Sequence, residues 1–118
     1  RHAHVQKLQR VDAVWPWLAD RHGLIAAVDA PHAAHPERFN FGELAERIAT
    51  AASAFRRHGV KDGDVVALFA ENSPRWLVAD QGLMRAGAAD AVRGASAPVE
   101  ELRYILSDCR ATALVVQN

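Results

Sequence analysis

The chain has 118 residues, half of them hydrophobic, which is enough for one compact domain with a buried core. Lys and Arg balance Asp and Glu at 14 each, and this net charge of zero argues against a nucleic-acid-binding protein, which normally has a basic face. A single cysteine excludes an intrachain disulfide and favours a reducing, cytoplasmic setting, and no apolar run approaches the roughly 20 residues that a membrane span needs.

The N-terminal region, residues 1–22, is predicted to be an extension that contains one short helix. The helix is expected to begin near Pro16, because proline is well tolerated in a first turn, and to end at Gly23. Residues 24–30 form a short apolar run bounded by a glycine and a proline, which is typical of a strand. Residues 31–37 contain two prolines and are expected to form a loop.

The clearest predicted helix follows this loop. Asn40 is a good N-cap, and Glu43 can reach back to the Asn40 backbone N–H, which makes a capping box. Apolar residues then recur at spacings of three and four and define one buried face: Leu44, Ile48, Ala51, Ala52 and Phe55. Gly59 is expected to end the helix.

The remainder of the chain alternates between strands and helices. Residues 65–70 are an almost continuous apolar run, which predicts a strand covered on both faces. Ser73, followed by a proline, is the expected N-cap of a second helix. After a candidate strand at residues 88–92, Pro98 opens a third helix, and residues 111–116 form the last strand.

This alternation predicts an α/β fold for residues 23–118, with a mostly parallel sheet flanked by helices. The chain stops directly after a strand, where a doubly wound sheet would normally continue into a covering helix. We therefore expect the chain to be a fragment of a larger protein.

Few side chains are candidates for chemistry. His2, His4, His32 and His35 fall in two predicted loops without cysteine partners, so solvated histidines are favoured over a metal site. Cys109 has no histidine near it in the sequence, which favours a half-buried structural thiol over a nucleophile.

The acidic stretch HGVKDGD at residues 58–64 is interpreted as a solvated turn. Neither G-x-x-x-x-G-K-[ST] nor a G-x-G-x-x-G that follows a strand is present. The residues alone therefore indicate an α/β domain with no visible catalytic site.

An ordered set of motifs between Asn40 and Val116 resembles the N-terminal subdomain of the adenylate-forming (AMP-binding) acyl ligases, the superfamily that includes acyl-CoA synthetases. The motifs are NFGEL, GVKDGDVVAL, NSPRW, RAGAADAV, PVEELRYIL and ALVV. Most members carry a vPLxP pattern where this chain has AVRGASAPVEEL. That variant is similar to the long-chain fatty acyl-CoA and acyl-ACP synthetases of cyanobacteria and plastids.

The resemblance implies that the whole protein is a two-step ligase that uses ATP and Mg²⁺. A fatty acid carboxylate would attack the ATP α-phosphate to give acyl-AMP, and the thiol of CoA or of acyl carrier protein (ACP) would then displace AMP. The family's phosphate loop, later nucleotide motifs and C-terminal lysine are not in this sequence, so this piece is expected to bind no cofactor and to be inactive alone. Peripheral membrane association of the whole protein is plausible, and the isolated piece is expected to self-associate through an exposed sheet edge.

The resemblance also implies one candidate site. The loop from Arg93 to Ser96 corresponds to a loop near the channel of the thiol acceptor. Arg93 would face an acceptor phosphate, and Gly94 would let pantetheine pass close to the backbone. The alternative for the same residues is a solvated charge at a strand end and a turn glycine. The alternative function is a free-standing, non-catalytic α/β binding or interaction module.

Overall fold

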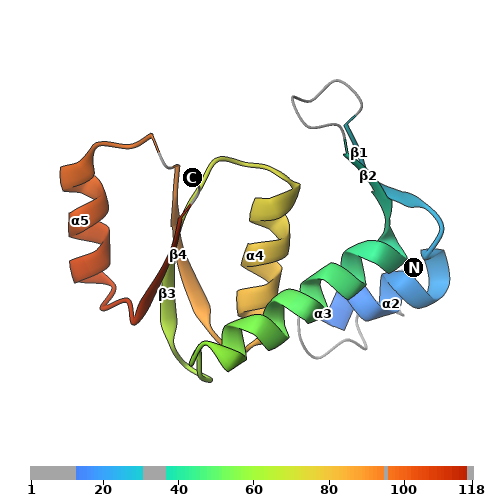
Figure 1. Cartoon of the computed structure of the whole chain (residues 1–118), viewed down its shortest axis with the longest axis horizontal. Coiled ribbons are helices and arrows are strands. Elements are labelled where there is room, and N and C mark those ends of the chain that lie inside the picture. The colour runs from blue at the N-terminus through green and yellow to red at the C-terminus, as the bar shows by residue number, and fades with distance from the viewer. Residues whose placement is uncertain (1–12, 31–36, 95, 117–118) are drawn as a thin grey trace. The chain divides into compact units, whose positions relative to one another are not determined.

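The computed structural model describes residues 13–30, 37–94 and 96–116, and the chain forms two compact units, residues 1–47 and 48–118. The predicted division into an extension, residues 1–22, and one α/β subdomain stays a prediction. The elements, drawn in Figure 1, are α2 (Val14–His22), β1 (Ala26–Ala30), β2 (Glu37–Asn40), α3 (Phe41–Arg57), β3 (Val65–Phe69), α4 (Pro74–Arg85), β4 (Ala89–Arg93), α5 (Val99–Asp108) and β5 (Ala113–Val116). Helix α3 begins in the first unit and ends in the second.

The first unit contains an antiparallel hairpin of β1 and β2, in which Ala26 pairs with Asn40 and Ala30 pairs with Glu37. The strand predicted at residues 24–30 therefore exists, but it pairs with a strand that the sequence reading missed and not with the parallel sheet. Strand β2 has the sequence ERFN, in which only Phe39 is buried. So short and polar a segment gives no periodic apolar signal.

The predicted capping box opens helix α3. The Asn40 N–H donates to Oε1 of Glu43 at 3.0 Å, and the Glu43 N–H donates to Oδ1 of Asn40 at 2.8 Å. Just before the cap, Phe39 is 1% exposed, and the Arg47 guanidinium lies 4.1 Å from the centroid of its ring. Arg47 also pairs with Glu37 at 3.4 Å, so the helix start and β2 are joined within this unit.

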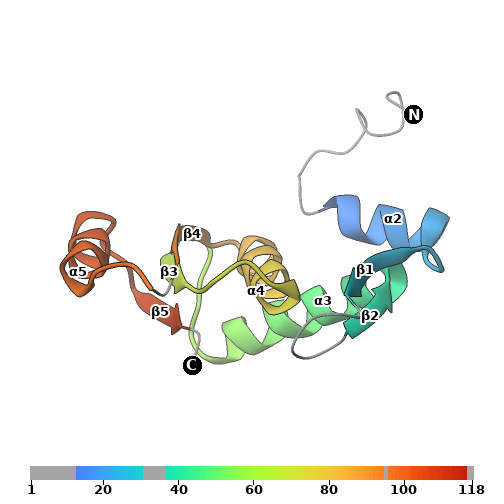
Figure 2. The same cartoon turned by 90° about the horizontal axis from the view of Figure 1, so that it is seen from above.

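The second unit contains a three-stranded parallel sheet with the strand order β4-β3-β5, which confirms the predicted fold class. Helices α4 and α5 lie on opposite sides of this sheet in both Figure 1 and Figure 2. Strands β3 and β4 are neighbours, yet the chain leaves β3 toward one face and β4 toward the other. This arrangement follows from right-handed crossovers that step to β4 on one side of β3 and to β5 on the other.

The core of the second unit joins the C-terminal half of α3 to α4 and β3. Its buried members are Ala52, Val60, Val66, Leu83, Ala86 and Ala88, with Phe55 and Val115 packed against them. A Cβ atom on Gly82 would lie only 2.8 Å from the Cβ of Ala51 and 3.3 Å from the ring of Phe55. The absence of a side chain at Gly82 is therefore what allows α3 and α4 to pack so closely.

The turns follow the sequence prediction. Oδ2 of Asp64 accepts from the Lys61 N–H at 2.8 Å, and the Gly63 N–H donates to the Gly87 carbonyl at 2.8 Å. The acidic stretch is therefore a hydrogen-bonded turn, as interpreted from the sequence. At the start of α4, Oγ of Ser73 accepts from the Trp76 N–H at 3.1 Å and forms the predicted cap.

Candidate functional site

The topology points to the carboxyl edge of the parallel sheet. In open α/β sheets, ligands bind outside the carboxyl ends of the strands, at the place where neighbouring strands send their connections to opposite faces. Here that place lies between β3 and β4, because α4 and α5 lie on opposite sides. The residue after β3 and the last residue of β4 are joined by a hydrogen bond of 3.0 Å from the Ala70 N–H to the Arg93 carbonyl oxygen.

Glu71 lies at this edge and binds the segment that follows β4. Its Oε1 accepts from the Ser96 hydroxyl at 3.1 Å and from the Ser96 N–H at 3.4 Å. A Cβ atom on Gly94 would lie 3.0 Å from the same oxygen and 3.5 Å from Cδ of Glu71. The carboxylate therefore occupies the space that a side chain at position 94 would need.

Arg93, the predicted phosphate contact, is paired with a carboxylate. Its Nε donates to Oε1 of Glu101 at 2.8 Å and its Nη2 to Oε2 at 3.4 Å, and the two side chains are 48% and 42% exposed. The hydrogen bond and charge of Glu101 raise the pKa of Arg93, and the charge of Glu71 adds to this effect. Since one guanidinium lies near two carboxylates, this cluster does not attract a phosphate unless Arg93 exchanges its partner.

The sequence prediction named Arg93, Gly94 and Ser96, and the structure brings all three to the carboxyl edge of β4. It missed Glu71 and Glu101, the carboxylates that bind them. One usable signal was available for Glu71: an acidic residue that directly follows a buried parallel strand lies at the edge where such folds bind ligands.

A second acidic group lies near the amino end of β4. Oδ2 of Asp90 is buried and has no hydrogen-bond partner among the described residues. Burial raises the pKa of Asp90 from its ordinary 3.8 to about 7, with further contributions from the hydrogen bond and charge of Asp80. Asp80, in α4, accepts a hydrogen bond of 2.8 Å from the side chain of Gln81. Asp90 therefore keeps its proton to a higher pH than an ordinary aspartate does.

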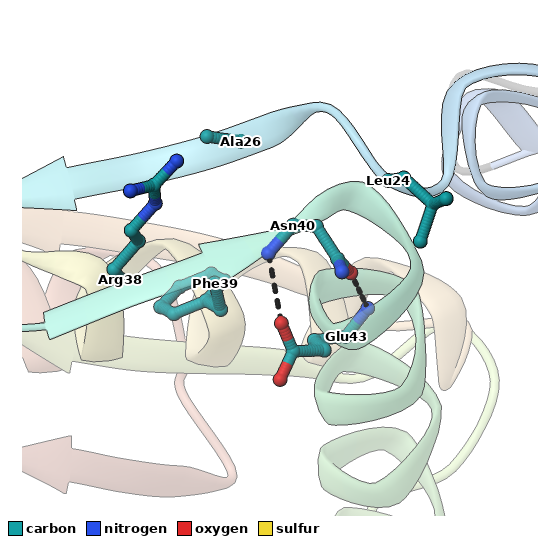
Figure 3. Close-up of a pocket in the computed structure, with 6 residues that line it drawn as sticks. All are labelled: Leu24, Ala26, Arg38, Phe39, Asn40 and Glu43. Atoms are coloured by element: carbon teal, nitrogen blue, oxygen red, sulfur yellow. Dashed lines mark hydrogen bonds between the residues drawn. The ribbon is translucent and has the colours of Figure 1, made fainter.

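The first unit has an open pocket, shown in Figure 3. Its volume of about 230 Å³ is smaller than that of most ligand pockets. It is lined by Leu24, Ala26, Arg38, Phe39, Asn40 and Glu43. Figure 3 shows that Asn40 and Glu43 are directed toward each other in the capping box, so their polar groups already serve the helix. This pocket offers no pair of groups arranged for catalysis.

The remaining candidates from the sequence are Cys109 and four histidines. Cys109 is half-buried at the end of α5, where its Sγ lies 3.9 Å from the Leu106 carbonyl oxygen, consistent with a structural thiol. His2, His4, His32 and His35 lie outside the described residues. Among residues 13–30, 37–94 and 96–116, no group of three His, Cys, Asp or Glu side chains could hold a metal ion.

The family model of AMP-binding enzymes matches residues 16–118. The chain belongs to this family. It is 41% identical over 108 residues to the probable acyl-activating enzyme 16, chloroplastic, of Arabidopsis thaliana. It is 39% identical over 108 residues to the long-chain-fatty-acid–[acyl-carrier-protein] ligase AEE15, chloroplastic, of the same plant. Each match covers 92% of this chain but only 15% of the relative, so the chain spans about a seventh of their length.

Solved structures show the same fold for this member of the AMP-binding enzymes. The N-terminal subdomain of Klebsiella oxytoca NpsA, in complex with 3-hydroxyanthranilyl-AMSN, matches with a TM-score of 0.85 at 22% identity. The match covers 94% of this chain and 28% of that subdomain. The resemblance to N-terminal subdomains of adenylate-forming acyl ligases, and to plastid enzymes in particular, is thereby confirmed. No helix in the described part of the chain is long and apolar enough to cross a membrane.

Proposed function

We propose that the whole protein is an ATP-dependent long-chain fatty acid ligase and that this chain forms part of its N-terminal subdomain. The observation that carries the proposal is the similarity, at 39% over 108 residues, to a relative named as a long-chain fatty acid ligase of ACP. In the first step a carboxylate oxygen of the fatty acid attacks the ATP α-phosphorus, and pyrophosphate leaves. In the second step the sulfur of an ACP or CoA thiol attacks the acyl carbon, and AMP leaves.

ATP and Mg²⁺ belong to the whole protein in this proposal. The described residues include no group of three His, Cys, Asp or Glu side chains suited to a metal ion, and the sequence has neither G-x-x-x-x-G-K-[ST] nor a G-x-G-x-x-G that follows a strand. Residues elsewhere in the protein would therefore hold the nucleotide and the metal. The part played by this chain is to form a rigid sheet edge beside which the second step takes place.

The decisive experiment measures fatty-acid-dependent ATP–pyrophosphate exchange. The whole protein is expected to catalyse exchange with palmitate and not with acetate or an aromatic acid of similar solubility. The isolated 118-residue chain, assayed in parallel, is expected to catalyse none. Exchange that depends on an amino acid or an aryl acid, with no response to palmitate, contradicts the proposed substrate class, and exchange by the isolated chain contradicts its assignment as an inactive piece.

We further propose that Arg93, Gly94 and Ser96 border the path of the thiol acceptor. Their place at the carboxyl edge between β3 and β4 supports this, because that edge is where open α/β sheets bind ligands. The backbone around Gly94 would lie along the pantetheine arm, and Arg93 would exchange Glu101 for an acceptor phosphate. A pantetheine thiol is common to CoA and ACP, so the contact does not by itself distinguish the two acceptors.

Two further properties are proposed for the molecule in solution. The whole protein would work in the cytoplasm or an equivalent compartment. It would contact the membrane surface peripherally, because its long-chain substrate partitions into lipid.

The isolated chain would self-associate through β5, an edge strand of the sheet on which Leu114 is 46% and Val116 is 56% exposed. Sedimentation at increasing concentrations measures this association, and a Val116→Lys variant is expected to remain monomeric.

A further inference from the structure

Among the described residues, the Glu71 side chain binds the segment after β4 to the segment after β3. Between these segments the backbone supplies the hydrogen bond from Ala70 to Arg93, and the Glu71 carboxylate supplies two contacts to Ser96. Both donors on Ser96 reach the same oxygen, Oε1. Glu71 and Ser96 are both exposed, so water competes for these bonds. Bonds to an ionised acceptor are stronger than bonds between neutral groups, and two of them on one oxygen make Glu71 suited to fix this segment.

The residue beside the carboxylate is a glycine, and its position is matched to Glu71. Both carboxylate oxygens of Glu71 would lie within 3.4 Å of a Cβ atom at position 94. A larger residue would therefore push either the loop or the carboxylate away. The close approach and the hydrogen bonds place Gly94 and Ser96 against the same side chain.

Arg93 contributes less than Glu71 to holding the loop in place. Arg93 donates to Glu101 in the first turn of α5, and this pair is about half exposed. Exposed ion pairs contribute little to structure. Glu71 contacts the loop on the side of β3, whereas Glu101 binds Arg93 from the helix that follows. Of these two carboxylates, Glu71 is therefore the one that joins the two strand ends.

We propose that Glu71 is the positioning residue of the acceptor loop and acts through Gly94 and Ser96 on the acyl-transfer step. The inference rests on the proposed function, since it assigns Glu71 to the second step of that reaction. Glu71 contacts no reacting atom in this scheme. It holds the loop in the one arrangement that admits the pantetheine arm, so its loss weakens binding of the thiol acceptor and leaves formation of acyl-AMP intact.

The test uses the whole protein with Glu71→Ala, Glu71→Gln and Ser96→Ala, and an exposed control, Glu100→Ala, from the same region. ATP–pyrophosphate exchange with palmitate reports the first step, and acyl transfer at varied ACP and CoA concentrations reports the second. Glu71→Ala is expected to raise the acceptor KM by about tenfold, which is the effect of losing a hydrogen bond to a charged group. The rate of ATP–pyrophosphate exchange is expected to stay within about twofold of wild type. Glu71→Gln keeps an acceptor oxygen for Ser96 and is expected to recover most of the loss. The double variant Glu71→Ala/Ser96→Ala is expected to be no worse than Glu71→Ala, because the Ser96 hydroxyl has already lost its acceptor when the Glu71 carboxylate is removed.

A second measurement is independent of the substrate. Hydrogen–deuterium exchange of the whole protein is expected to show faster exchange at residues 93–98 in Glu71→Ala and in Ser96→Ala, with no change in Glu100→Ala. Unchanged exchange at this loop overturns the positioning role, whatever the enzyme acts on. Equal loss in both reaction steps without recovery in Glu71→Gln also overturns it, because that pattern indicates general structural damage. If wild type fails to use palmitate while the loop still loosens in Glu71→Ala, the proposed substrate is wrong and the assignment of Glu71 to the loop stands.

Discussion

The two ends of strand β4 place charged side chains in opposite surroundings. At the carboxyl end, Arg93 is about half exposed and donates to both carboxylate oxygens of Glu101. Near the amino end, Asp90 has a buried oxygen with no hydrogen-bond partner among the described residues, and a second carboxylate, Asp80, lies close to it. Water stabilises the charges of Arg93 and Glu101 whether or not they are paired. The buried carboxylate of Asp90 beside Asp80 is poorly hydrated, and binding a proton lowers its free energy.

The largest expected effect is therefore a pH dependence that arises at Asp90. The folded pKa of about 7 lies above the ordinary 3.8, so between these values the folded chain holds a proton that the unfolded chain has lost. The stability that this proton contributes is fully present below pH 3.8 and is lost as the pH rises through about 7. We expect the free energy of unfolding to fall by about 2 kcal/mol between pH 5 and pH 8, less than a full conversion of the shift because Asp90 is partly exposed.

Urea unfolding of this chain at a series of pH values measures the effect, and Asp90→Asn is the matched control. An asparagine has nearly the shape of a protonated aspartate and can donate to Asp80 in the same way. The variant is expected to lie nearest to wild type at the lowest pH of the series, below about pH 4, and to be more stable than wild type by a margin that grows up to pH 8. Parallel pH profiles for the two proteins would show that Asp90 titrates normally.

This comparison also shows why sequence could predict one end of β4 better than the other. Arg93, Gly94 and Ser96 could be named from the sequence because the ordered motifs around them resemble the acyl ligases, whose corresponding loop lies near the acceptor channel. Asp90 and Asp80 are ten residues apart on different elements, and their proximity depends on how α4 packs against β4. No local pattern encodes that packing, so the buried carboxyl could be found only in the structure.

The fold also divides into features that local sequence patterns predict and features that depend on distant partners. The caps at Asn40 and Ser73 were predictable because capping depends on residues three positions apart. The alternation of the second unit was predictable because βαβ crossovers impose a parallel sheet. Strand β2 was missed, and β1 was assigned to the wrong kind of pairing, since the pairing of a short polar strand depends on a partner that its own sequence does not specify.

The Asp80→Asn variant is expected to have a smaller effect, and it distinguishes the two causes of the raised pKa of Asp90. Burial is the larger cause and the interaction with Asp80 is the second. Asp80→Asn removes the neighbouring charge and leaves the burial, so it is expected to reduce the pH dependence between pH 5 and pH 8 by about half, or roughly 1 kcal/mol. The same unfolding series measures it. Complete loss of the pH dependence in Asp80→Asn would reverse the order of the two causes.

The smallest effect on stability is expected at the carboxyl end. Arg93→Ala removes a half-exposed ion pair and is expected to lower the free energy of unfolding by less than either the Asp90 or the Asp80 variant changes it, with the difference from wild type shrinking further at high salt. Its matched control is Arg103→Ala, an exposed arginine of α5.

The informative measurement on these two variants is the acceptor KM of the whole enzyme. If Arg93 exchanges Glu101 for a phosphate of the acceptor, Arg93→Ala raises the acceptor KM several-fold with almost no loss of stability, while Arg103→Ala changes neither. An unchanged KM in Arg93→Ala reduces Arg93 to a solvated strand-end charge. Because the Glu71 side chain and not the Arg93 side chain joins the two strand ends, that result would remove the phosphate contact and still leave the loop in place beside the acceptor.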